Sequence, residues 1–331
     1  MTPLASGSAP LQLRDLPLGE PARCQTPEPG DPRLQRFSLN QKTVDGWGLE
    51  ELVAGCVDAG VPAVGLWREP VQRFGIERAA RLVQGAGLRV SSLCRGGFLT
   101  ATDDGAVRAA LDDNCRAIEE AATLAAPCLV MVVGGLPDGS RDLVAARRQV
   151  AEGMEKLAPV ALDHGVQLAL EPLHPMFCSD RAVLSTLGQA IDLAELYPAE
   201  AVGVVIDAYH VWWDPKLDDE VARAAGRIAS YQVCDWTLPL AADPLLSRGM
   251  MGDGAVDLPR LTALIAAAGY LGDIEVEIFN QHLWDAEPRA VLDTVLRRYV
   301  EHVAGAGASS SPVPPAGSVA DDLDDPERSS I

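Results

Sequence analysis

Acidic and amide side chains end four consecutive apolar runs in the second half of the chain. Glu171 follows LAL, Asp207 ends VGVVID, Gln232 and Asp235 lie in SYQVCD, and Glu275 and Glu277 alternate through IEVEIF. Apolar runs rich in β-branched residues are typical of buried parallel strands, whose carboxyl ends meet at one face of a barrel. A single such acid could cap a helix or form an ion pair, but four runs ending this way favour a common site.

This cluster of acids predicts a bound cation. Burying several carboxylates together costs several kcal/mol for each unpaired charge, and a divalent metal ion would supply the missing positive charge. Oxygen ligands with one amide suit Mn²⁺ or Mg²⁺, whereas Co²⁺ or Zn²⁺ becomes an alternative when a histidine takes part. We therefore expect one divalent ion, most simply Mn²⁺ or Mg²⁺.

His210 stands three residues after Asp207, in VIDAYH. An isolated Asp-x-x-His would be read as a helix cap followed by a satisfied core histidine. Beside a predicted metal site, His210 could instead contact the substrate, orient Asp207, or replace a missing ligand. The sequence leaves these roles open.

The runs that must position these side chains alternate with longer amphipathic segments. The expected strands are Arg36–Asn40, Ala63–Trp67, Arg89–Cys94, Cys128–Val133, Gln167–Glu171, Val202–Asp207, Ser230–Asp235 and Ile274–Phe279. The expected helices are Leu49–Ala59, Val71–Gln84, Asp104–Ala125, Leu143–His164, Ala182–Tyr197, Leu217–Ala225, Leu258–Ala268 and Pro288–Val303. Four glycines fall just past helix ends, where a left-handed C-cap is favoured: Gly60, Gly87, Gly165 and Gly269.

Eight βα units predict an α/β fold, a (β/α)8 TIM barrel. A doubly wound open sheet is the alternative, but it usually carries a nucleotide-binding motif, and neither G-x-G-x-x-G nor a P-loop occurs here. We expect the barrel to span residues 33–305. Residues 1–32 are expected to be a mobile leader that lies partly on the barrel surface, and residues 306–331 a disordered acidic tail.

Composition narrows the class of partner. The 331 residues include 47 acidic and 27 basic side chains, a formal net charge of −20, which disfavours nucleic acid and anionic membranes as partners. The seven cysteines form no C-x-x-C pair and are expected to be reduced thiols. The sequence shows neither a signal-peptide pattern nor a long apolar span, so a cytoplasmic location is expected.

The motifs LALEPLHP, VIDAYH, QVCDW, RGMMGDG and GYLGDIEVEIF occur in this order. They resemble those of the sugar phosphate isomerases/epimerases, a group of xylose isomerase-like TIM barrels related to inosose and dehydroshikimate dehydratases and to endonuclease IV. The resemblance covers residues 36–303 and is strongest in the second half. It implies one Mn²⁺-type ion held from strands 5, 6, 7 and 8, by Glu171, Asp207, Gln232 and Glu277.

Gln232 departs from this pattern, because most members have histidine there. Its carbonyl oxygen can still bind a hard cation, which would make the site less suited to zinc. If Gln232 does not bind the metal, His210 or Asp235 is the expected substitute. Between the strand-8 acids, Glu277 is preferred as the ligand because it lies nearer the end of the strand, with Glu275 one layer deeper.

Such a site suits proton transfer on a ketose or keto-sugar. The substrate would chelate the metal through its carbonyl and a neighbouring hydroxyl, which acidifies the carbon-bound proton between them. Glu171 and Glu277 would then act as base and acid through a cis-enediolate. The expected activity is a sugar isomerase or epimerase. A lyase or dehydratase with the same chemistry, or a barrel that binds a sugar or protein partner without turnover, are the alternatives.

Other residues after strand ends are candidate substrate contacts. Arg248, in SRGMMGDG, matches the loop arginine that reaches substrate oxygens in the similar family. His174 could donate to substrate or hold its loop, and Trp67 could stack on a sugar ring. Trp212, Trp213 and Trp236 are candidates for stacking, core packing or oligomer contacts. The expected partner is a small sugar, with a homo-oligomer or an oxidoreductase that supplies a keto-sugar as further possibilities. Endonuclease activity is disfavoured because the chain has only five histidines, too few for the several metals of that chemistry, and because its net charge is acidic.

Overall fold

The computed structural model describes residues 24–305. Most of the predicted leader, up to residue 23, and the predicted tail at 306–331 therefore lie outside the described residues. Residues 24–31 run along the last helix, where the Cys24 thiol donates to the carbonyl oxygen of Arg297 and the Arg297 guanidinium donates to the Thr26 hydroxyl. These two contacts attach the start of the described chain to the outer layer of helices.

Eight parallel strands form a closed barrel, in the order β1-β10-β7-β6-β5-β4-β3-β2. The strands are β1 (Phe37–Asn40), β2 (Ala63–Trp67), β3 (Arg89–Gly97), β4 (Cys128–Val132), β5 (Gln167–Leu170), β6 (Val202–Asp207), β7 (Ile228–Val233) and β10 (Ile274–Val276). Because β1 pairs with both β2 and β10, the sheet has no free edge. The predicted TIM barrel is confirmed, and the open sheet is excluded.

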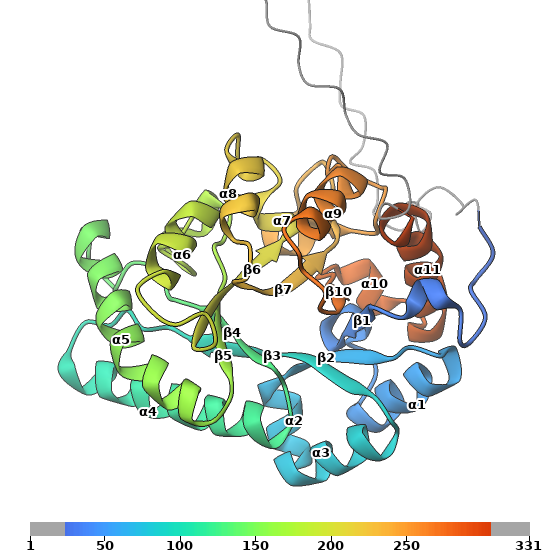
Figure 1. Cartoon of the computed structure of the whole chain (residues 1–331), viewed down its shortest axis with the longest axis horizontal. Coiled ribbons are helices and arrows are strands. Elements are labelled where there is room, and N and C mark those ends of the chain that lie inside the picture. The colour runs from blue at the N-terminus through green and yellow to red at the C-terminus, as the bar shows by residue number, and fades with distance from the viewer. Residues whose placement is uncertain (1–23, 306–331) are drawn as a thin grey trace, which may run out of the picture.

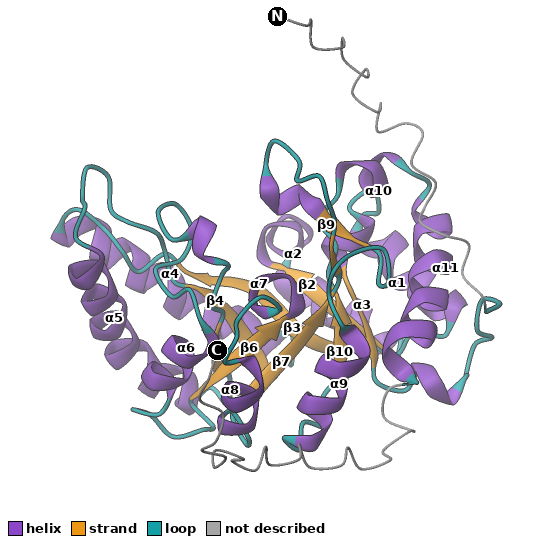
Figure 2. Ribbon diagram, turned by 90° about the horizontal axis from the view of Figure 1, so that it is seen from above, coloured by secondary structure: helices purple, strands orange, loops and turns teal. Residues whose placement is uncertain are grey.

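Helices surround the strands on the outside, as Figures 1 and 2 show from two directions. The α-helices are α1 (Leu49–Ala59), α2 (Arg68–Phe74), α3 (Ile76–Gly85), α4 (Asp104–Thr123), α5 (Leu143–Asp163), α6 (Leu187–Ala194), α7 (Ala208–Val211), α8 (Leu217–Arg223), α9 (Leu258–Ala267), α10 (Gln281–Asp285) and α11 (Pro288–Tyr299). Short 3-10 or π turns are η2 (Pro32–Leu34), η3 (Gln41–Val44), η4 (Pro175–Phe177), η5 (Pro244–Ser247) and η6 (Val300–Ala304).

Local sequence accounts for several helix boundaries. Asp103 and Asp142 accept backbone N–H groups at the start of α4 and α5, which satisfies donors that lack a partner within the helix. The four glycines predicted to follow helix ends all have positive φ, as a left-handed cap requires. In α1, Leu49, Leu52, Val53 and Cys56 recur at helical spacing and are buried, whereas Val57 is exposed.

Several expected elements differ from the structure; β10, for example, ends at Val276 and not at the predicted Phe279. The helix predicted at Val71–Gln84 is two helices, α2 and α3, because Gly75 between them has φ +95 and ends the first. The helix predicted at Ala182–Tyr197 begins only at Leu187, where Thr186 caps it. The strand predicted to reach Asp235 ends at Val233. Asp235 belongs instead to β8 (Asp235–Trp236), which pairs antiparallel with β9 (Arg248–Gly249).

No helix among residues 24–305 combines the length and the apolar character that are needed to cross a membrane.

The hydrophobic core lies between the barrel and its helices, where apolar side chains of nearly every strand and helix are buried.

Candidate metal centre and active site

Strand register brings the predicted ligands together at the carboxyl end of the barrel. Asp207 of β6 lies beside Gln232 of β7, and Gln232 lies beside Glu275 of β10. Glu171 directly follows β5 and Glu277 directly follows β10. These five side chains are all buried, although each is charged or strongly polar.

Asp207 is completely buried at the end of β6. Its Oδ1 accepts the backbone N–H of Tyr209 at 2.9 Å, which caps α7, while its Oδ2 lies 2.8 Å from Nη1 of Arg248. Burial raises the pKa of Asp207, whereas Arg248 and the N–H of Tyr209 act in the opposite direction. The helix-cap role and the predicted site role therefore use different oxygens of one carboxylate.

Arg248 lies between two of the predicted ligands. Its Nη1 contacts Asp207 Oδ2 and lies 3.0 Å from Glu277 Oε2, and the side chain is only 2% exposed. An arginine on a solvated loop would have an exposed side chain. Arg248 is buried instead, and it is an internal counter-charge of the acid cluster. A short turn and the β8–β9 pair bring it there, and Asn280 Nδ2 donates to its carbonyl oxygen at 2.9 Å.

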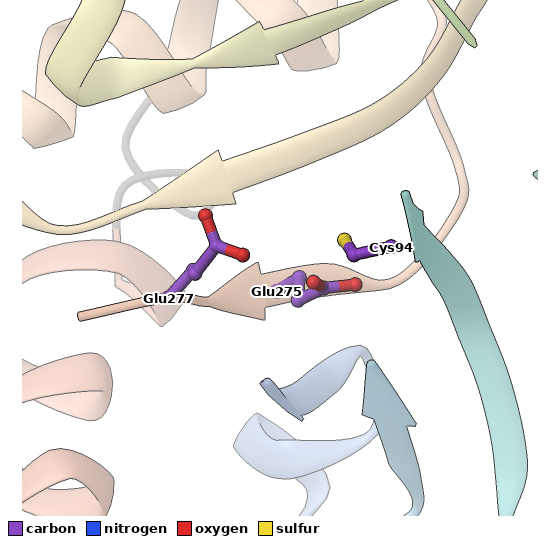
Figure 3. A group of neighbouring side chains, drawn as sticks. All are labelled: Cys94, Glu275 and Glu277. Atoms are coloured by element: carbon purple, nitrogen blue, oxygen red, sulfur yellow. The ribbon is translucent and has the colours of Figure 1, made fainter. Parts of the chain in front are cut away.

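Glu277 faces the interior at the end of β10, with Glu275 one layer below it, and Cys94 of β3 stands beside both (Figure 3). Asn40 of β1 links the two acids, because its Nδ2 lies 2.6 Å from Glu275 Oε1 and 2.9 Å from Glu277 Oε1. Burial raises the pKa of Glu277 to about 8 despite the opposing effect of Arg248. The Cys94 thiol has a pKa well above its usual range, also because it is buried, so it stays protonated.

Glu275 is held by a dense set of donors. Besides Asn40, the hydroxyls of Ser91 and Ser92 donate to its Oε2 at 2.6 and 2.8 Å, and Gln232 Nε2 donates to its Oε1 at 3.2 Å. This last bond fixes the amide of Gln232, whose own Oε1 is buried and has no hydrogen-bond partner. Glu275 thus has a structural role below the site, as its deeper position on the strand predicted.

Glu171 completes the cluster from β5. One oxygen of Glu171, one of Asp207 and a ring nitrogen of His210 lie within 4.8 Å of one another. Burial raises the pKa of Glu171 well above its usual range, and the negative charges of Asp207 and Glu277 raise it further. The pKa of Glu171 and that of Glu277 are therefore both raised by their burial in the cluster.

The cluster fits a divalent cation on two grounds. Two buried acceptor atoms lack a hydrogen bond, Gln232 Oε1 and Asp207 Oδ2, the second of which has only its ion pair with Arg248. When ionised, the carboxylates of Glu171, Asp207 and Glu277 place three negative charges against the one guanidinium of Arg248. With Glu275 also buried one layer below, the negative charge exceeds that of Arg248, and a divalent ion would offset the excess.

His210 is buried beside the cluster with a neutral ring. Its Nδ1 lies 3.2 Å from the backbone N–H of His174, and its Nε2 lies 3.8 Å from Asp207 Oδ2 and 3.2 Å from Arg248 Nη2. Burial lowers its pKa well below the usual value, and Arg248 lowers it further. A neutral imidazole can accept at only one of its two nitrogens, so the ring makes one of these two hydrogen bonds at a time.

A cavity opens above the cluster, with about 480 Å³ of empty space including its mouth. Glu171, Gln232, Glu277, His210 and Arg248 form its polar floor. Its wall includes three aromatic side chains, which are Trp67, Phe98 and Phe279. Trp67 also donates through its indole N–H to Asn40 Oδ1 at 3.0 Å, which ties the wall to the network under Glu277.

Other candidates lie elsewhere. His174 caps η4, where its Nδ1 accepts the N–H of Met176, and its ring packs against Trp213 and Trp236 at 5.3 and 5.0 Å between ring centroids. It holds the loop after β5 and does not line the cavity. Trp213 donates to the carbonyl of His210, and Trp212 packs near Trp236, so these indoles are packing groups.

Asp235 is unsuited to replace Gln232 as a ligand. Its two oxygens accept the backbone N–H groups of Trp236, Gly252 and Val256 at 2.8 to 3.0 Å. These bonds hold the loop that carries Arg248. The prediction of Asp235 as a substitute ligand is therefore wrong, and the reason is that the strand ends before it.

Sequence reasoning missed Asn40, Arg95 and Arg181. Asn40 ends β1 as the acids end their strands, so the same reasoning applied to a neutral side chain would have found it. Arg95 and Arg181 also line the cavity, from β3 and from the loop after η4. Only the closed barrel reveals them, because neither belongs to a recognisable motif.

The solved structure of protein SMc04130 from Sinorhizobium meliloti 1021 is similar to this chain, with a TM-score of 0.79 and 45% sequence identity over 82% of this chain and 99% of that one. An IolI protein solved with a bound zinc atom has the same fold, with a TM-score of 0.72 at 18% identity over 83% of this chain and 100% of that one.

Among curated proteins, the inosose isomerase of Halalkalibacterium halodurans is 24% identical over 161 residues, which are 48% of this chain and 55% of that protein. The chain thus spans about half the length of this curated relative. The family model described as "Xylose isomerase-like TIM barrel" matches residues 53–299. The chain belongs to the xylose isomerase-like TIM barrel family.

Proposed function

We propose that this protein is a divalent-metal-dependent isomerase or epimerase of a ketose or keto-sugar. The observation that carries the proposal is the convergence of three buried carboxylates and an unpartnered amide oxygen at one end of the barrel, where Glu171, Glu277 and Gln232 line the floor of one cavity. The similarity to an inosose isomerase supports the reaction class, and the bound zinc of the IolI structure supports a metal site in this fold.

The residues that would hold the metal are Glu171, Asp207, Gln232 and Glu277. Each offers an oxygen atom, a donor set that favours Mn²⁺ or Mg²⁺ over zinc. The bound ion would supply Lewis acidity at the substrate carbonyl and a neighbouring hydroxyl, which lowers the pKa of the carbon-bound proton between them.

Glu171 and Glu277 are the proposed base and acid. They come from β5 and β10, which are separated in the barrel by β6 and β7, so their carboxylates reach the cavity floor from different sides. One carboxylate removes the proton to give a cis-enediolate of the sugar, and the other returns a proton. Return to the opposite face of the same carbon gives an epimer, and return to the neighbouring carbon gives an isomer.

Two side chains would contact the substrate oxygens. The ring of His210 and the guanidinium of Arg248 both lie on the cavity floor, where negative charge develops in an enediolate. The aromatic wall, with Trp67 and Phe279 in edge contact at 5.6 Å between ring centroids, limits access of water to that floor.

Exchange of carbon-bound hydrogen with solvent tests this function. Protein loaded with Mn²⁺ should incorporate deuterium from D₂O into a ketose or keto-sugar of a panel. Glu171→Gln and Glu277→Gln should each reduce the exchange rate by about 10²- to 10⁴-fold, the usual contribution of a general acid or base. Glu200→Gln, the same change at an exposed position, should leave it unchanged.

The result is read from both exchange and products. Exchange without loss of water identifies an isomerase or epimerase, whereas loss of water would replace that reading with a lyase. Absence of exchange across the panel, or full exchange in both glutamine variants, would refute the proposed assignment of base and acid.

A further inference from the structure

Two arginines outside the proposed machinery line the same cavity. Arg95 projects from β3, and Arg181 lies in the loop that follows η4. In the ring of eight strands β3 is four places from β7 in either direction, so Arg95 lies across the barrel mouth from Gln232. The cavity therefore has Arg95 on the wall opposite Gln232, with Arg181 on the loop that follows β5.

Arg95 is not ion-paired within the described part of the chain, although the charge of Glu171, which lines the same cavity, acts on it. Its Nη1 is buried without a hydrogen-bond partner, and no ion pair joins it to an acidic side chain among residues 24–305. Its guanidinium packs instead over the Phe98 ring, 4.3 Å from the centroid, and lies 6.0 Å from that of Trp67. Stacking of this kind positions the planar group but does not neutralise it.

The neighbouring Arg68 shows how this fold satisfies a structural arginine. Arg68 is paired with Asp113 at 2.9 Å and with Glu120 at 2.6 Å, and both acids come from α4. Arg95, whose carbonyl oxygen lies 3.5 Å from Arg68 Nη1, receives no such pair in a chain with a net charge of −20. Arg95 therefore lacks an ion pair because of its place in the cavity, and not because the chain has too few acidic residues.

Arg181 is also incompletely paired. Its Nε is buried without a hydrogen bond, and its charged contacts are Asp180 at 3.6 Å and Asp243 at 4.0 Å, both well exposed to solvent. Burial lowers the pKa of Arg95, and the nearby charge of Arg181 adds to that effect. Two like charges thus face one space that an anion would fill favourably.

We propose that Arg95 and Arg181 bind an anionic group of the substrate, a carboxylate or a phosphate, while its reacting carbons face Glu171 and Glu277. This deepens the proposed function and rests on it for the position of the reacting carbons. The substrate class is then an acidic keto-sugar, that is, a keto-sugar acid or a keto-sugar phosphate. Guanidinium groups suit both, because they pair with planar or tetrahedral oxyanions through two parallel hydrogen bonds.

Binding of simple oxyanions tests the site without any reaction. Metal-free protein, treated with a chelator, is titrated by calorimetry with inorganic phosphate and separately with glycolate. The wild type is expected to bind at least one of them, and Arg95→Gln and Arg181→Gln should each weaken binding about tenfold or more. Arg81→Gln, the same change at an exposed position of α3, should bind like the wild type.

Folding is checked in each variant by circular dichroism and melting temperature, and Arg95→Lys provides a second variant that retains the charge. It should bind more tightly than Arg95→Gln. The proposal is overturned if the wild type binds neither anion, or if both glutamine variants bind as it does.

A second arm identifies the kind of anion. Deuterium exchange is compared for a neutral ketose, its terminal phosphate ester and the corresponding keto-sugar acid. One anionic form should exceed the neutral ketose in kcat/KM by about tenfold or more, and Arg95→Gln should remove that preference. Equal kcat/KM for neutral and anionic forms overturns the proposal while leaving the isomerase intact. If no compound exchanges, the proposed function fails, and the calorimetry alone decides whether the anion site exists.

Discussion

At the scale of single residues, Gln232 determines what kind of metal the site would prefer. Its amide nitrogen is committed to Glu275, so the oxygen is the atom left to face the cluster. A histidine at this place would offer a nitrogen, a softer ligand that suits zinc. The sequence identified the substitution, and the hydrogen bond from Gln232 to Glu275 gives the orientation of the amide.

Gln232→His should shift metal preference toward zinc. We expect the ratio of zinc to manganese affinity to rise about tenfold or more, because an imidazole nitrogen replaces an amide oxygen. The measurement is competitive metal binding at fixed pH, followed by metal analysis. Gln232→Leu is the matched control, since it fills similar space without a ligand atom and should weaken both metals. An unchanged ratio in Gln232→His would show that residue 232 does not bind the metal.

At the scale of elements, the packing of β3 against β4 positions Arg95, one of the two arginines that line the cavity beside the proposed machinery. The end of β3 approaches β4 closely at Gly97, where φ is +109 and an added Cβ would overlap the backbone carbonyl of Val132. Asn114 of α4 fixes the same glycine from outside, accepting its N–H and donating to its carbonyl. Arg95 lies two residues earlier, so its place depends on this packing.

Gly97→Ala should destabilise the protein by more than strain in φ alone. A left-handed backbone costs an ordinary residue about 1–2 kcal/mol, and the overlap with Val132 should add to it. Gly87→Ala is the matched control, because Gly87 also has positive φ but nothing within 4 Å of the added carbon. Urea denaturation of both variants compares the two free energies of unfolding. Equal losses in the two variants would show that β4 moves to accommodate the added carbon without lowering the free energy of unfolding.

At the scale of the whole molecule, the proposed metal binding would be coupled to folding stability. The acids that would bind the ion come from strands spread over half of the barrel, so the site exists only when the barrel is closed. Arg248 offsets part of their repulsion from within the fold. The remaining negative charge is a cost that a bound cation would remove.

Removal of metal should therefore lower stability. At a free Mn²⁺ concentration of about 100 times Kd, the free energy of unfolding should exceed that of chelator-treated protein by about 2.7 kcal/mol. Chemical denaturation with and without the metal measures the difference. Asp207→Asn removes one charged ligand and should abolish most of the increment while the variant remains folded. An increment of wild-type size in Asp207→Asn would place the metal elsewhere.

Much of the architecture could be predicted because its signals are local. Apolar runs, amphipathic spacing and glycines past helix ends each depend on a few neighbouring residues, and together they indicated the eight units of a TIM barrel. Closure of such a barrel brings strand ends together, so Glu171, Asp207, Gln232 and Glu277 could be placed at one mouth from their positions alone.

The tertiary structure decided which groups meet there and which do not. Asn40 reaches Glu277 across 237 residues of sequence, and Arg248 enters the acid cluster on a loop, neither of which a local pattern can indicate. The same packing placed Asp235 in the β8–β9 pair and turned His174 toward tryptophans. Sequence determined the strands and their polar ends because these follow from local chemistry. The counter-charges, and the unpaired Arg95 across the cavity, follow from contacts between distant segments that only the closed barrel creates.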